Sequence, residues 1–407
     1  MDDTRLIVAY IASKELMQIS SLLPSNPQRS TLVHTLARSL NLYSREFSAE
    51  RFLQLVPPQK AERSQLNLYH TDDYLNFVLN PDNADELSKT EYGLEEDCPL
   101  FRGVSLYVEL VGGAAITAVK TLQHPRCQVA ICWDGGRHHA KKNSASGFCY
   151  VADCVLAIMQ LRRLTQQTPS GPRKPRIMYL DLDLHFSDGV SQAFHQTSST
   201  SPNILTLSIH HTAPGFFPST PLADLPTPTS DPFTLSLPLQ QGASNATFLR
   251  AWACVERIRT AFDPDFVVVQ CGVDSLAGDP HAIFNWSLGP CDDISGRGSL
   301  GWCVSRVLNH PDWRGKKLLL GGGGYDSPNA ARAWAYLTSI ALGNPLPLNT
   351  EIPSDETNEF FPQYAPSFTL DVPAGTMQDR NTDEYLRSVE RVFEEAAIAI
   401  QQRLNAT

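Results

Sequence analysis

The chain has 407 residues, of which 42% are hydrophobic and 19% are charged, as is typical of a globular protein with a large core. Its formal net charge of −10 argues against a protein that binds nucleic acid through the phosphate backbone. Nine cysteines occur without a CxxC pair. We interpret them as buried thiols of a reducing compartment, and neither as a disulfide framework nor as a zinc knuckle.

The N-terminus has no basic region before its short apolar run, so it differs from a signal peptide. No apolar run approaches the roughly 20 residues that span a bilayer. We therefore expect no membrane partner, no direct nucleic-acid partner, and a location in the nucleus, the cytoplasm or both.

The first third of the chain contains one predicted strand and three predicted helical segments. In chain order we predict a strand at Leu6–Tyr10, a helix at Gln28–Leu40, a loop entering a helix at Tyr69–Leu79 and a long helix at Val104–Leu122. Thr71 or Asp72 is the expected N-cap of the third element. Gly112 and Gly113 lie inside the long helix and indicate close packing there.

Strands and helices are interspersed in the rest of the chain. We predict strands at Gln128–Trp133, Ile177–Asp183, Asn203–His211, Asp265–Gly272 and Lys317–Leu320, helices at Phe248–Phe262 and Asp383–Leu404, and loops at Thr165–Arg176 and Pro218–Pro232. This pattern predicts a single α/β domain over residues 1–407, with a parallel central sheet covered by helices on both faces. Residues 383–407 would form a C-terminal docking helix.

The stretch Ile177–Val190 carries the strongest functional pattern. Its apolar strand leads into Asp181, Asp183 and His185, which alternate and therefore share one face of an extended chain. Two carboxylates and an imidazole are costly to bury together unless a cation lies among them, and they suit zinc or a similar divalent metal. The alternative is that the acidic residues only cap the next helix.

Polar and aromatic candidates follow five predicted strands. Parallel sheets bind ligands beyond the carboxyl ends of their strands, so these side chains should meet at one edge. The candidates are His138 and His139, Asp183 and His185, Phe217, Asp274, and Tyr325. The two adjacent histidines could equally be surface residues, and the phenylalanine could plug the core. Gly321–Gly324 leaves room for a ligand but lacks the Gly-Lys-Ser/Thr of a P-loop.

These residues suffice for metal-assisted hydrolysis. Asp183, His185 and Asp274 give the three protein ligands of a catalytic metal site. His138 and His139 can act as base and acid, with Asp181 and Asp188 fixing their tautomers, and Tyr325 can donate to an oxyanion. No serine or cysteine nucleophile with an adjacent base is evident, which disfavours covalent acyl transfer.

The chain resembles the class I histone deacetylases, which have the arginase-like α/β fold. The matching segments are WDGGRHHAKKNSASGFCY (133–150), YLDLDLHFSDGV (179–190), SIHHTAPGFFP (208–218), VVVQCGVDSLAGDP (268–280) and LGGGGYDSPNAARAW (320–334), with looser matches at 26–36 and 93–101. It looks most like the short, tail-less subgroup. The resemblance implies zinc-dependent hydrolysis of N6-acetyl-lysine in histones or other proteins, and a role in chromatin or cohesin regulation.

The resemblance also implies a role for each matching residue. Asp183, His185 and Asp274 would bind zinc, or iron in the cell. His139 would be the general base and acid, and Asp188 would be its partner. His138 would act electrostatically beside it, with Asp181 as its partner, and Tyr325 would stabilise the oxyanion.

The resemblance further implies a set of residues that contact the substrate: Arg29, Asp97, Gly147, Phe148, Phe217, His281, Gly323 and Tyr325. Arg29 would line an inner acetate channel, although an arginine near a helix start is by default solvated. Asp97 would hold the substrate backbone, although its acidic loop, Gly93–Pro99, is by itself typical of a solvent-exposed run of charges.

The resemblance also implies structural potassium, held by Asp181, Asp183, His185, Ser208 and Ile209, and a second potassium site that includes Phe194 and Thr197. Hydroxamate-type inhibitors and corepressor proteins are further implied partners.

Four departures from the family pattern concern the rim of the site. Phe186-Ser187 replaces a His-Gly, and His281 stands where the family has Leu or Met. Pro218–Pro232 lacks the usual glycines, and Cys291–Gly301 looks inserted. Two alternatives stay open: an acetylpolyamine deacetylase on the same fold, and a catalytically silent corepressor scaffold. A binuclear ureohydrolase would need more carboxylate ligands than this sequence offers.

Overall fold

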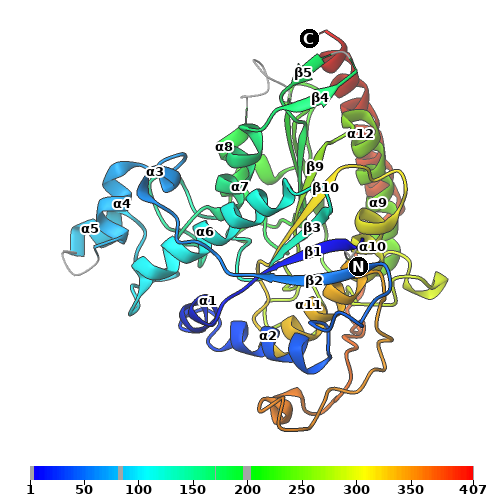
Figure 1. Ribbon diagram of the computed structural model, residues 1–407. Helices are drawn as coiled ribbons and strands as arrows, with labels where there is room; N and C mark the ends of the chain where they lie inside the picture. The colour runs from blue at the N-terminus through cyan, green and yellow to red at the C-terminus, as the bar shows by residue number, and fades with distance from the viewer. Residues whose placement is uncertain (1–3, 81–85, 170, 196–202, 407) are drawn as a thin grey trace.

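Eight parallel strands form one sheet at the centre of the protein (Figure 1). The computed structural model describes residues 4–80, 86–169, 171–195 and 203–406. The strand order is β2-β1-β3-β10-β9-β6-β7-β8. The bounds are β1 Leu6–Ile11, β2 Arg51–Val56, β3 Cys127–Cys132, β6 Ile177–Asp181, β7 Ile204–His211, β8 Thr234–Leu239, β9 Phe266–Gln270 and β10 Lys316–Leu320.

Helices cover both faces of this sheet (Figure 1). On one face lie α2 Arg29–Ser39, α9 Asn245–Phe262, α10 Leu300–Asn309, α11 Ser327–Ala341 and α12 Asp383–Asn405. On the other lie α1 Lys14–Ser20, α4 Asp72–Val78, α6 Val104–Leu122, α7 Asp153–Arg162 and α8 Asp188–Phe194. The short helices α3 Arg63–Leu66 and α5 Glu86–Glu91 lie close to α4. This arrangement confirms the predicted fold class.

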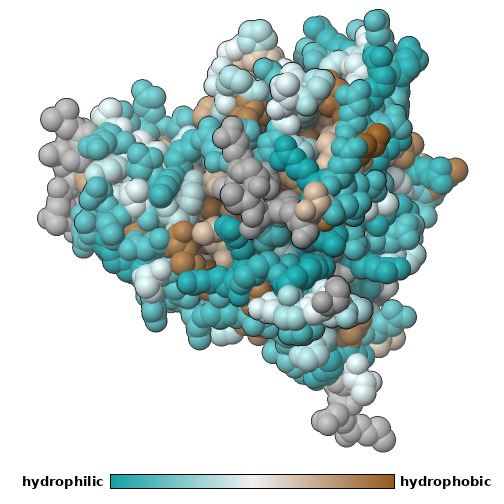
Figure 2. All heavy atoms as spheres, turned by 90° about the horizontal axis from the view of Figure 1, so that it is seen from above, coloured by the Kyte–Doolittle hydropathy of each residue, from teal (hydrophilic) through white to brown (hydrophobic). Residues whose placement is uncertain are grey.

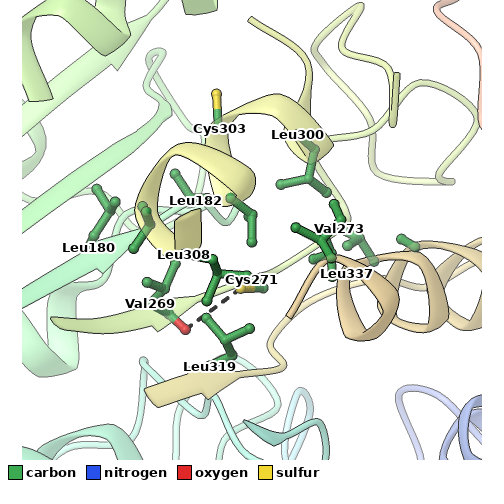
Figure 3. Packing of buried hydrophobic residues seen from close by; sticks show 14 of the residues in the cluster. Leu180, Leu182, Val269, Cys271, Val273, Leu300, Cys303, Leu308, Leu319 and Leu337 are labelled. Atoms are coloured by element: carbon green, nitrogen blue, oxygen red, sulfur yellow. Dashed lines mark hydrogen bonds between the residues drawn. The ribbon is translucent and has the colours of Figure 1, made fainter. Parts of the chain in front are cut away.

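Alternate residues of each strand face the two helical layers. Val267 and Val269 of β9 belong to one buried cluster, whereas Phe266 and Val268 belong to the other. Figure 3 shows part of the first cluster at close range, with labelled side chains from β6, β9, β10, α10 and α11. Burial on both sides explains why the central strands are continuous apolar runs. All nine cysteines are buried and free, as predicted.

The predicted elements are present, with ends that differ by a few residues at most. Thr71 caps α4, because its hydroxyl accepts a hydrogen bond from the backbone N of Tyr74. Gly113 of α6 is closely packed: a Cβ there would lie 1.9 Å from the carbonyl oxygen of Gln59. By length and hydropathy α6 is the one described helix that could span a membrane, but it is largely buried in the core. The face seen in Figure 2 is mostly hydrophilic, with scattered hydrophobic patches.

The sequence interpretation missed or misassigned several segments. The edge strands β2 and β8 were not predicted. The segment Thr165–Arg176 is not wholly loop, because β4 Gln166–Thr168 and β5 Gly171–Arg173 pair as an antiparallel hairpin. One turn of 3-10 helix interrupts the predicted loop at 218–232, at Pro221–Ala223.

Candidate active site

Three potential metal ligands meet beyond the carboxyl ends of β6 and β9. The ligand atoms of Asp183, His185 and Asp274 all lie within 4.8 Å of one another. Backbone and amide groups fix the carboxylates: Leu184 N donates to Asp274 Oδ1 (2.9 Å), and Gln270 Nε2 donates to Asp183 Oδ2 (2.8 Å). The cluster is therefore held in place by the ends of two neighbouring strands.

The chemistry of this cluster fits a divalent cation. Burial, followed by the charge of Asp183, raises the pKa of Asp274 to about 7. Burial would lower the pKa of His185, but hydrogen bonds to both carboxylates raise it to about 10. Both pKa values are raised, so the buried cluster retains protons that offset the conflict between its two carboxylate charges. A cation bound by two carboxylate oxygens and an imidazole nitrogen would replace those protons and relieve the conflict.

Glycines allow the neighbouring loops to approach this cluster. A Cβ on Gly272 would lie 2.1 Å from Asp183 Oδ2, and a Cβ on Gly323 would lie 2.4 Å from Asp274 Oδ2. The backbone N of Gly323 also donates to Asp183 Oδ2 (2.8 Å). Side chains at these two positions would displace the carboxylates, so the glycine loop is part of the cluster's support.

Two histidine–aspartate pairs lie beside the cluster, on the loop after β3. His138 Nδ1 lies 2.9 Å from Asp181 Oδ2, and His139 Nδ1 lies 2.8 Å from Asp188 Oδ1. All four side chains are buried. Each carboxylate accepts from Nδ1–H, which leaves the Nε2 atom of each neutral imidazole as the acceptor.

The pKa values of the two imidazoles are shifted in opposite directions. Burial opposes charge on both, but the charges of Asp181 and Asp183 raise the pKa of His138 to about 9. Burial and the neighbouring His138 lower the pKa of His139 to about 4. A dication in the cluster would lower both pKa values, and His139 would keep the lower pKa of the two.

Lys141 is a site residue that the sequence interpretation missed. Its Nζ forms an ion pair with Asp188 Oδ2, on the opposite oxygen from His139. Although burial opposes it, the pairing with His139 and Lys141 lowers the pKa of Asp188 to about 2. The only sequence signal was a lysine two residues after the histidine pair.

Aromatic rings border the histidines and the tyrosine. The ring of Phe217 contacts His139 at 4.8 Å between centroids and is 39% exposed. A Cβ on Gly147 would lie 2.7 Å from the His139 ring and 2.9 Å from the Phe217 ring. Phe148 contacts Tyr325 edge to face at 5.5 Å. Phe216, the neighbour of Phe217 in the sequence, stacks on His185 at 5.2 Å.

Tyr325 follows the glycine loop after β10 and is held from its backbone. Its N–H donates to the buried carboxylate of Asp279 (2.6 Å), which also accepts from the N–H groups of Asp326 and His281. Burial and the charge of Asp274 raise the pKa of the Tyr325 hydroxyl, so it remains a proton donor. Asp279 was missed, although it lies inside the matching segment 268–280.

The three residues predicted to line the rim or the acetate channel differ in their exposure to solvent. Arg29 is buried, and its Nη1 donates to the carbonyls of Gly322 and Gly324 (2.9 Å each), so the solvated interpretation of this arginine is wrong. Asp97 is exposed on its acidic loop. His281 is also exposed, but its ring contacts the Tyr325 ring at 4.6 Å.

Three of the seven predicted potassium ligands lie on two paired strands. Asp181 pairs with Ser208 in the register of β6 and β7, and Ile209 is the next residue of β7. The Ser208 hydroxyl lies 3.0 Å from His210 Nδ1. Phe194 is buried at the end of α8, whereas Thr197 lies outside the described residues.

Comparison with known proteins gives consistent matches. The histone deacetylase domain profile matches residues 23–341. The chain is 35% identical over 390 residues to histone deacetylase 8 of Xenopus tropicalis, covering 94% of this chain and 96% of that protein. It is 35% identical over 387 residues to histone deacetylase 8 of Danio rerio, covering 94% and 93%. It is 35% identical over 381 residues to histone deacetylase 1 of Homo sapiens, covering 91% of this chain and 70% of that protein.

Proposed function

Because the chain belongs to the histone deacetylase family, whose members are metal-dependent deacetylases, we propose that it hydrolyses N6-acetyl-lysine in proteins with a zinc ion held by Asp183, His185 and Asp274. The observation that carries this proposal is the buried three-ligand cluster beside two histidine–aspartate pairs. Bound zinc, or iron in the cell, would polarise the acetyl carbonyl and acidify a water molecule.

We assign the proton transfers to His139. Asp188 holds its Nδ1–H, so the free Nε2 can take a proton from the attacking water. The same Nε2 can then return that proton to the departing lysine amine, and acetate is released. His138, whose pKa is higher, provides positive potential next to the developing negative charge. Asp181 keeps that imidazole oriented.

Tyr325 is the proposed donor to the oxyanion that forms on the acetyl carbonyl. Its raised pKa keeps the hydroxyl protonated, and the Asp279 carboxylate fixes its backbone. Gly147, Phe148 and Phe217 would border the acetyl-lysine side chain, and Gly323 would leave space at its end. His281 and Asp97 would contact the substrate at the rim, and Arg29 would line a channel for acetate.

Further parts of the proposal rest on the family resemblance. Potassium would bind near Asp181, Asp183, His185, Ser208 and Ile209, where two strand ends lie side by side. Hydroxamates, which chelate metals, would bind the same cluster as the substrate, and corepressor proteins are proposed partners. We also propose that residues 1–407 act as one catalytic domain in the nucleus, the cytoplasm or both.

A substrate comparison tests this function. Zinc-loaded enzyme should release acetate from acetylated histone or cohesin-type peptides, and much less from acetylated polyamines. His139→Asn, which keeps a polar side chain, should abolish the reaction while the zinc content stays unchanged. Faster hydrolysis of acetylpolyamine would instead assign the enzyme to small-molecule substrates. No hydrolysis of either substrate by metal-loaded protein would support a silent scaffold.

A further inference from the structure

The proposed mechanism leaves a fully buried amide side chain beside the metal cluster without a role. Gln270 is the last residue of β9 and is 0% exposed. It follows the four apolar residues Phe266–Val269 and pairs with Leu320 of β10 and with Asp181 of β6. A buried amide needs hydrogen-bond partners, because an unsatisfied one costs stability. The contacts of this side chain therefore indicate what it does at the end of the strand.

Both ends of the Gln270 amide are hydrogen-bonded. Its Oε1 accepts from the backbone N of Gly272 (2.7 Å). Its Nε2 donates to Asp183 Oδ2 (2.8 Å) and lies 3.3 Å from the carbonyl oxygen of Gly136. A backbone N–H can only donate and a carbonyl can only accept, so these partners fix which end of the amide faces the carboxylate. Gln270 therefore presents a donor to Asp183.

The glycine loop after β10 closes over this amide. Gly322 has a φ of +143°, and a Cβ there would lie 2.2 Å from Gln270 Nε2. The loop backbone therefore occupies the space into which the amide would otherwise turn. Through these contacts Gln270 connects the segments that follow β3, β6, β9 and β10, which are the segments that build the site.

The two oxygens of Asp183 have different surroundings. Oδ2 accepts from Gln270 Nε2 and from the backbone N of Gly323, both at 2.8 Å. A carboxylate oxygen has about two acceptor positions, so Oδ2 is saturated. Oδ1 lies 3.4 Å from His185 Nδ1, and Asp274 Oδ2 lies 3.0 Å from the same nitrogen. Oδ1 is therefore the oxygen of Asp183 that faces the other two ligands.

We infer that Gln270 is a positioning residue of the metal site. It holds Oδ2 of Asp183, so that Oδ1 alone is offered to the metal, and it ties that carboxylate to Gly136, close to His138 and His139. Groups that hold metal ligands by hydrogen bonds typically change metal affinity ten- to a hundredfold. The inference rests on the metal-binding part of the proposed function, and adds which oxygen binds and which side chain sets the affinity.

Zinc affinity, measured without substrate by competition with a chelator, tests this role. Gln270→Met keeps the length of the side chain but removes its donor, so zinc binding should weaken roughly ten- to a hundredfold. Gln270→Asn keeps an amide that is one methylene too short, and should bind zinc as weakly. Gln54→Met, at an exposed glutamine of the edge strand β2, should bind as wild type. Wild-type affinity in Gln270→Met or in Gln270→Asn would overturn the inference.

The visible absorption of the cobalt(II)-substituted protein separates positioning from a purely structural role. Without Gln270 the Asp183 carboxylate is free to turn and to offer both oxygens. The coordination number of cobalt should then rise, and its visible absorption should be weaker in Gln270→Met than in wild type. A residue that only supports the fold would lower Tm without changing this spectrum. An unchanged spectrum would overturn the positioning role, whatever the change in Tm.

A crystal structure of the zinc-loaded wild type decides the question even if Gln270→Met does not fold. Zinc should lie about 2.0–2.2 Å from Asp183 Oδ1, with Oδ2 still bonded to Gln270 Nε2. Zinc bound through Oδ2, or an amide turned away from Asp183, would contradict the inference. A wild-type protein that binds no zinc would instead contradict the proposed function. Tight zinc binding without a difference between wild type and Gln270→Met would leave that function intact and remove only the role of Gln270.

Discussion

Single side chains in this site depend on partners that come from other loops. Tyr325 is at once near the cluster, in ring contact with Phe148 and His281, and held by the Asp279 carboxylate. The sequence alone could predict Tyr325, because it follows an apolar strand and a run of glycines. It could not predict the burial of Arg29, since the carbonyls that accept its hydrogen bonds lie 293 and 295 residues away.

The Tyr325 hydroxyl should be essential for rate but not for metal binding. Tyr325→Phe should lower kcat by roughly a hundredfold or more, the scale of one lost oxyanion donor. Zinc content and the unfolding transition should match wild type. Steady-state assays with an acetylated peptide measure the effect, and a rate within a few-fold of wild type would mean that another group holds the oxyanion.

Asp279 should act on rate by positioning Tyr325. Asp279→Ala removes the acceptor of three backbone N–H groups, two of them at residues 325 and 326. We expect kcat to fall roughly ten- to a hundredfold through misplacement of the hydroxyl, with little change in KM.

Two further variants separate this effect from a general loss of structure. Asp279→Asn, which retains one acceptor oxygen, should recover part of the rate. Asp292→Ala, at an exposed carboxylate, should behave as wild type. Equal losses in kcat and zinc content for Asp279→Ala would indicate structural collapse instead of positioning.

At the scale of elements, the buried central strands were predictable and the edge strands were not. The central strands are continuous apolar runs because both of their faces are covered. β2 carries the exposed residues Gln54 and Leu55, so its apolar pattern is weak. β8 contains Pro238 next to a proline-rich loop, a sequence tolerated only at a sheet edge.

The loop between β3 and α7 is anchored by a buried histidine. The backbone N of Ala152 donates to His70 Nε2 (3.0 Å), and His70 Nδ1 lies 3.3 Å from the carbonyl oxygen of Lys142. Burial lowers the pKa of His70 to about 4. The unfolded chain, with an ordinary pKa near 6.5, therefore binds more protons than the native state between these two values.

Stability should consequently fall as the pH drops from about 6.5 toward 4. His70 alone contributes at most about 3 kcal/mol to this loss. His70→Gln keeps an acceptor for Ala152 but cannot be protonated, so its free energy of unfolding should depend less on pH in this window. Urea titrations of both proteins at pH 7 and 4.5 measure the difference. Identical pH dependence would show that His70 does not carry the effect.

At the scale of the whole molecule, one parallel sheet brings the candidate site together. The loops after β3, β6, β7, β9 and β10 reach the same edge because all these strands run in one direction. The sequence could therefore predict which residues meet, from their positions just past strand ends. It could not predict the surrounding hydrogen bonds, such as those of Lys141 and Gln270, since these depend on distances between loops.

The central claim is that three ligands from two strand ends make this chain a metal-dependent deacetylase. Zinc titration into metal-free protein, with hydrolysis of an acetylated peptide as the readout, tests it most directly. Activity should be absent without metal and should rise to a plateau at about one zinc per chain, the stoichiometry of a three-ligand catalytic site. Asp183→Ala and Asp274→Ala should lose zinc and activity together. Full activity in the metal-free protein, or in either variant, would contradict the account.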